Sequence, residues 1–147
     1  MVAVMSSKSP LPRQLPPDIA TWGEQVLPPD DPFRHIGDEV YPSLYDLYAE
    51  EFVGVPAPKG LTPVDLAFVV ALGGQNDLTV DAAAERLQID LAWKYALHLP
   101  LDHPGCSGDA LWRFVKRMER PNSPQRIPFG FIIEMVRMVF MGQRATP

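Results

Sequence analysis

The chain has 147 residues, of which 46% are apolar, and it carries a formal net charge of −5. This length fits one domain with its own core and excludes several full domains, and the apolar content excludes a largely disordered chain. The single cysteine, Cys106, excludes an intramolecular disulfide framework and favours a reducing compartment, the cytoplasm.

Nothing in the sequence predicts a membrane protein. The N-terminus lacks the basic and then apolar pattern of a signal peptide. The longest apolar stretch, Ile127 to Met141, has about 15 residues and contains Glu134 and Arg137, whereas a span needs roughly 20 apolar residues. We therefore expect a soluble protein without a membrane partner.

Charge is distributed unevenly along the chain. Residues 18–51 contain nine acids against one base, Arg34, whereas residues 113–144 contain seven bases against Glu119 and Glu134. Such asymmetry is more informative than the net charge. Because only the local potential within about 10 Å matters at ordinary salt, the basic end can bind phosphate on an acidic protein.

The first half of the chain predicts a proline-rich lead-in followed by helices. Residues 1–32 contain seven prolines and are expected to be extended. Apolar residues from Ile36 to Phe52 recur at helical spacing, and Pro42 is expected to split them into two short helices. Residues 55–60 read as a loop. Thr62, Pro63 and Asp65 then form a strong helix start, and the following run of apolar residues to Leu72 predicts a helix buried on all sides.

The second half predicts shorter capped helices and a tail. Thr79 and Asp90 are expected to cap helices over 79–88 and 90–97, and Ser107 a helix over 109–118, after a loop at 100–108. Residues 121–128 read as a linker, and 129–141 as one short amphipathic helix at best. The sequence thus predicts an all-α fold, with a lead-in (1–32), a small helical bundle (33–118), and a linker with a short divergent tail (119–147).

The expected helix 109–118 presents a candidate binding surface. Four basic residues, spaced i, i+3, i+4 and i+7, share one face opposite Leu111, Phe114 and Met118, and Trp112 lies on the same helix. The four are Arg113, Lys116, Arg117 and Arg120. They can contact a phosphate backbone, and the alternative is an ordinary solvated helix face.

We expect Lys94, next to Trp93 and Tyr95, to supply further cationic and aromatic groups at the same end of the domain. The helices over 79–88 and 90–97, followed by 109–118, suit a helix-turn-helix whose last helix enters a major groove. The pattern is weak, because any small helical bundle has helix pairs joined by short turns.

Other chemistry has little support in the sequence. His98, His103 and Cys106 have the residue types of metal ligands, but a structural zinc site needs four ligands, and loop histidines with a buried cysteine are the better interpretation. No phosphate-binding glycine loop or nucleophile motif is present. We therefore assign no catalytic residue, metal or cofactor.

The stretch Ile89 to Gly105 resembles a family signature. Its residues IDLAWKYALHLPLDHPG are similar to "IDWKYALGLPLDDPGF" in the N-terminal domain of bacterial insertion-sequence transposases with a DDE core. The signature is carried by Asp90, Trp93, Lys94, Tyr95, Pro104 and Gly105. The similarity spans about residues 30–118, and Leu111 to Phe114 stand in the place of the family's "LSEFR".

The chain departs from this family in three ways. Two residues are inserted before Trp93, Cys106 replaces a phenylalanine, and the resemblance stops near Met118. The resemblance implies a catalytic core downstream that holds two metal ions on three carboxylates, and the 29 residues after Met118 are too few for it. We therefore expect a non-catalytic segment that binds transposon ends.

Two further functions stay open. One is a protein-interaction module that forms a homodimer, or a heterodimer with an intact transposase that it inhibits. The other is a small transcriptional regulator with a helix-turn-helix.

Overall fold

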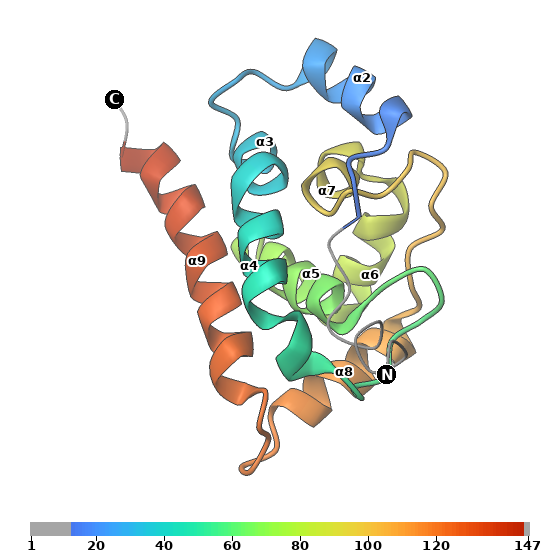
Figure 1. Cartoon of the computed structure of the whole chain (residues 1–147), viewed down its shortest axis with the longest axis vertical. Coiled ribbons are helices and arrows are strands. Elements are labelled where there is room, and N and C mark those ends of the chain that lie inside the picture. The colour runs from blue at the N-terminus through green and yellow to red at the C-terminus, as the bar shows by residue number, and fades with distance from the viewer. Residues whose placement is uncertain (1–12, 146–147) are drawn as a thin grey trace, which may run out of the picture.

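The structure, a computed structural model, describes residues 13–145, with only the backbone described for 143–145. All regular elements in this range are helical, which confirms the all-α prediction (Figure 1). In chain order they are α2 (Pro17–Val26), α3 (Pro32–His35), the π-helical turn η1 (Ile36–Val40), α4 (Tyr41–Tyr48), the 3₁₀ turn η2 (Ala49–Phe52), α5 (Pro63–Gln75), α6 (Val80–Ile89), α7 (Leu91–Ala96), α8 (Gly108–Met118) and α9 (Arg126–Ala145).

Helix α5 is the centre of the bundle, as its all-apolar sequence predicts. Thr62 and Asp65 form a reciprocal capping box, and Pro63 occupies the first position, where its missing N–H costs nothing. Leu66, Phe68 and Leu72 have no exposed surface. Helices α6, α8 and α9 all pack on α5, so the core surrounds it.

Pro42 does not separate two helices. Helical structure is continuous from Pro32 to Phe52, and the turn before the proline widens into η1, in which the Tyr41 N–H donates to the carbonyl of Ile36, five residues back. Pro42 then sits in the first turn of α4. Proline has no backbone N–H to donate, and the π-turn before it accommodates that loss, so helical structure continues through Pro42.

The extended lead-in predicted for 1–32 is wrong for residues 17–26, which form α2. Pro17 begins this helix because proline suits the first helical turn, and Asp18 lies where the helix dipole favours an acid. Ile19 and Leu27 pack with Tyr95 in a small second cluster against α7. The rest of the expected lead-in, residues 1–12, lies outside the described residues.

The predicted caps of the middle helices are confirmed, but a helix-turn-helix is not. The side chains of Thr79, Asp90 and Ser107 accept backbone N–H bonds at the starts of α6, α7 and α8. The helix expected to enter a groove is α8, and residues 97–107 separate it from α7, so no short turn joins these two helices.

The short divergent tail predicted for 119–147 is also wrong. Helix α9 has 20 residues and packs against α5. Ile132 and Val136 are completely buried in the main core, so the bundle does not end at residue 118. Pro128 is tolerated because it lies in the first turn of the helix. No helix of residues 13–145 is long and apolar enough to cross a membrane.

Candidate nucleic-acid interface

Helix α8 separates an apolar side from a basic side. Ser107 starts the helix by accepting a hydrogen bond from the Ala110 N–H at 3.1 Å. Leu111, Phe114 and Met118 are buried against the core, with the Phe114 ring stacked on Phe52 at 6.4 Å between centroids. This anchoring fixes which side of α8 faces solvent.

The predicted basic residues lie together on that solvent side. On α8, Arg113 and Lys116 are exposed and Arg117 is partly exposed, and the exposed Arg120 lies in the turn two residues after the helix ends. Among residues 13–142, none of these four side chains forms an ion pair. We call these four residues the basic face of α8. Its charges are not neutralised within the described part of the chain, so they are free to attract an external anion.

An aromatic ring borders the basic face. Trp112 is 42% exposed, and the Lys116 ammonium lies 5.8 Å from the centre of its ring. A cation over an indole is held by the negative ring face. An exposed indole beside cations is also able to contact sugars or bases.

The basic face forms one wall of a groove. A cavity of about 660 Å³ lies between α8 and the segment Val55–Pro58, and all four residues of the basic face line it. A smaller hollow of about 410 Å³ continues past Arg117 and Arg120 along residues 121–125. Arg117 and Arg120 therefore line both hollows.

Lys94 does not join this surface. It is only 3% exposed, and its ammonium donates to the carbonyl of Leu101 at 2.7 Å. Burial lowers the pKa of Lys94, while the charge of Asp102 opposes that effect. The prediction that Lys94 contacts DNA is contradicted by this position, because α2 and the loop after α7 enclose α7.

The other signature residues have structural positions. Asp90 caps α7 by accepting from the N–H groups of Ala92 and Trp93, and it lies 3.5 Å from Arg86. Trp93 is fully buried, and its indole N–H has no partner within the described residues. Tyr95 is buried and donates to Asp38 at 2.6 Å.

The two remaining signature residues lie in the loop before α8. Pro104 is exposed and Gly105 is buried with a φ of 75°, which favours glycine. The signature thus describes the core and its turns, while the exposed basic face lies just beyond it.

A buried polar network was not predicted from the sequence. Arg13 forms a 2.9 Å ion pair with the completely buried Asp65 and donates to the Tyr41 hydroxyl at 3.2 Å. Tyr41 in turn donates to Asp65 at 2.6 Å. Burial by itself lowers the pKa of Arg13, but the adjacent Asp65 together with Tyr41 and Tyr45 outweighs burial and raises that pKa.

The network ties Arg13, before α2, to Tyr41 and Asp65 of the bundle. Only the Thr62–Asp65 cap was recognisable from sequence, because Arg13 is 52 positions away from its partner.

The residues weighed as metal ligands are dispersed. The two ring nitrogens of His98 each lie 2.6 Å from a backbone carbonyl oxygen, Nδ1 from that of Arg13 and Nε2 from that of Gly37. His103 contacts Gly60 and Gly105, and burial raises the pKa of the Cys106 thiol. Within the described residues no group of three or more His, Cys, Asp or Glu side chains is placed to hold a metal.

Comparison of the chain with protein-family models, with curated proteins and with solved structures finds no match.

Proposed function

We propose that the chain binds double-stranded DNA through the basic face of α8, as the end-binding region of an insertion-sequence transposase in the cytoplasm. The observation that carries the proposal is the exposed set Arg113, Lys116, Arg117 and Arg120, unpaired within the described residues and lining one groove. Guanidinium and ammonium groups in a row suit successive phosphates.

The distribution of charge over the fold also supports binding of DNA at α8. Helices α2 and α3 lie at the opposite end of the molecule from α8 (Figure 1). Asp18, Glu24, Asp30 and Asp31 are on α2 or in the loop after it, so these acids are remote from the basic face. These four acids act weakly at α8, since charges beyond about 10 Å are screened. Two acids lie nearer: Glu119 directly follows α8, and the Glu51 carbonyl accepts from Gln125, which lines the hollow beside Arg117 and Arg120.

The transposase assignment rests only on the sequence resemblance of residues 89–105. It implies transposon ends as the DNA, and it assigns no catalytic step to these residues. Most signature residues are buried or cap helices, so we assign them the role of positioning α8. Contact with DNA is assigned to the basic face.

The test is the salt dependence of binding to a short mixed-sequence duplex, measured by fluorescence anisotropy between about 50 and 200 mM salt. If all four basic residues contact phosphate, the slope of log K against log salt should approach about −3.6, or −0.9 per contact. The double variant Arg113→Ala/Arg117→Ala should reduce the slope by about 1.8.

The matched control removes the same charge elsewhere. Arg86 and Arg126 lie outside the groove, so Arg86→Ala/Arg126→Ala should leave the slope nearly unchanged. An equal loss in both double variants would mean that net charge, and not the basic face, governs binding. Absence of binding at low salt would reject the proposal.

A further inference from the structure

The outer side of α9 carries an apolar stripe. Ile127, Phe131, Met138 and Met141 are exposed by 84%, 42%, 54% and 46%, respectively. The opposite side of the same helix supplies Ile132 and Val136 to the core. A surface helix is normally polar on its outer side, and one that is apolar on both sides is normally covered on both.

The spacing of the stripe is that of a helix–helix seam. Together with Glu134, the exposed residues fall at positions 127, 131, 134, 138 and 141, which is an alternation of four and three residues. This alternation places side chains along the a and d positions of a coiled-coil pair. A stripe of this kind fits a second helix lying along α9.

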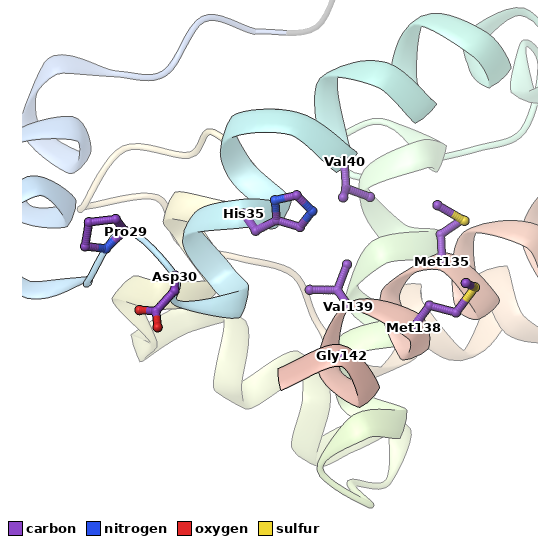
Figure 2. A pocket seen from close by; sticks show the side chains of 8 residues that line it. All are labelled: Pro29, Asp30, His35, Val40, Met135, Met138, Val139 and Gly142. Carbon is purple, nitrogen blue, oxygen red and sulfur yellow. The ribbon is translucent and has the colours of Figure 1, made fainter. Parts of the chain in front are cut away.

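A hollow next to the stripe has the form of a knob-accepting hole. It measures about 420 Å³, and α9 contributes Met135, Met138, Val139 and Gly142 to it. These residues are spaced i, i+3, i+4 and i+7, the four corners that surround a knob from a facing helix. Figure 2 shows them facing a second wall of the hollow, which includes His35 and Val40.

The charges on this side are self-complementary. Glu134 interrupts the stripe near its middle and pairs with Arg137 one turn later, where the Arg137 Nε lies 2.9 Å from the carboxylate. Both side chains remain nearly half exposed. If two α9 helices lie antiparallel about a two-fold axis near this point, each Glu134 approaches the Arg137 of the other copy, and the apolar ends of the stripe cover one another.

We propose that this stripe binds a second copy of the chain, forming an isologous dimer in which two α9 helices pack antiparallel. The surface lies outside the basic face of α8, so the inference does not depend on the proposed function. A contact made mainly by one helix per copy is smaller than the roughly 800 Å² per partner of a standard interface, so we expect a weak dimer with a dissociation constant of about 10 µM.

Sedimentation equilibrium of the full chain over protein concentrations from about 1 to 200 µM measures this constant. Met138→Glu places a carboxylate in the seam and should weaken the dimer at least about tenfold. Ile89→Glu is the matched control, because Ile89 is 77% exposed on α6, away from the stripe. Circular dichroism checks that both variants fold. A chain that stays monomeric throughout, or two variants that weaken the dimer equally, would overturn the proposal.

Charge exchange and cross-linking test the antiparallel arrangement. Glu134→Arg and Arg137→Glu should each weaken the dimer, and the double exchange should restore it. A cysteine at Glu134, near the axis, should oxidise to a covalent dimer. A cysteine at Ile127 should not, because its two copies are separated by more than about 15 Å along the helices. Preferential cross-linking through Ile127, or no rescue by the double exchange, would overturn the arrangement.

Discussion

His98 shows how one residue can hold distant segments together. It follows α7 with a φ of 57°, a left-handed conformation that is unfavourable for most residues other than glycine. Glycine would adopt this conformation without the cost that the histidine bears. The histidine ring places its two nitrogens 2.6 Å from the carbonyl oxygens of Arg13 and Gly37, which lie in segments far apart in the sequence.

We expect His98→Ala to lower the free energy of unfolding by about 1–3 kcal/mol, because the ring's hydrogen bonding to the buried carbonyls is lost while the strained φ remains. His98→Gly loses the same hydrogen bonds but relieves the strain, so it should cost about 1 kcal/mol less. Urea denaturation of both variants measures the difference. If alanine and glycine were equally tolerated, the backbone conformation would not contribute to stability.

Tyr95 predicts a loss of stability at high pH. Burial and the hydrogen bond to Asp38 raise its pKa to about 12, whereas an unfolded tyrosine titrates near 10. The folded state thus favours the protonated phenol. This contribution is complete below about pH 10 and is lost as the pH rises from about 10 to 12.

Urea denaturation at pH 9 and at about pH 11.5 measures that loss, and Tyr95→Phe is the control, since it keeps the ring and removes the titrating hydroxyl. The variant should be less stable than the wild type at pH 9 and should lose less on going to the higher pH. A wild type and variant with parallel pH profiles would contradict this account of Tyr95.

At the scale of elements, features set by neighbouring residues were predicted correctly, and features set by tertiary packing were not. The caps Thr62, Thr79, Asp90 and Ser107 act within a few residues of themselves, so the sequence identified each helix start. The helical state of residues 17–26 goes with packing of α2 on α7, and the π-turn before Pro42 packs on α7 and α9. No local pattern carries that information, and proline content alone suggested breaks where the helices in fact begin.

Phe68 on α5 tests the central element. Its ring is fully buried and packs edge-on against Tyr41, with centroids 5.3 Å apart. We expect Phe68→Ala to lower the free energy of unfolding by about 3–5 kcal/mol, through lost burial and the cavity left behind. Val70→Ala, at a partly exposed position on the same helix, should cost clearly less. A thermal melt that barely shifts for Phe68→Ala would show that α5 is not the centre of the core.

At the scale of the whole molecule, the sequence predicted the candidate surface better than its surroundings. The basic face of α8 follows from helical periodicity, and all four of its residues reach the groove. Lys94 was misplaced because the aromatic run 93–95 faces inward, which depends on α2 covering α7. The groove itself depends on the segment 55–58 lying beside α8, a contact between residues about 50 positions apart that spacing within one helix cannot predict.

The extent of the core gives the last prediction. Helix α9 packs on α5 and places Ile132 and Val136 in the same cluster as Leu66 and Phe68, so residues 126–145 should unfold together with the rest of the bundle. We expect Ile132→Ala to cost about 2–5 kcal/mol and Arg126→Ala, at an exposed position, less than about 0.5 kcal/mol. A chain shortened after Arg120 uncovers the α5 surface beneath α9 and should lose its cooperative melt. If that shortened chain melts cooperatively within a few degrees of the full chain, α9 is an appendage and the core ends near residue 118.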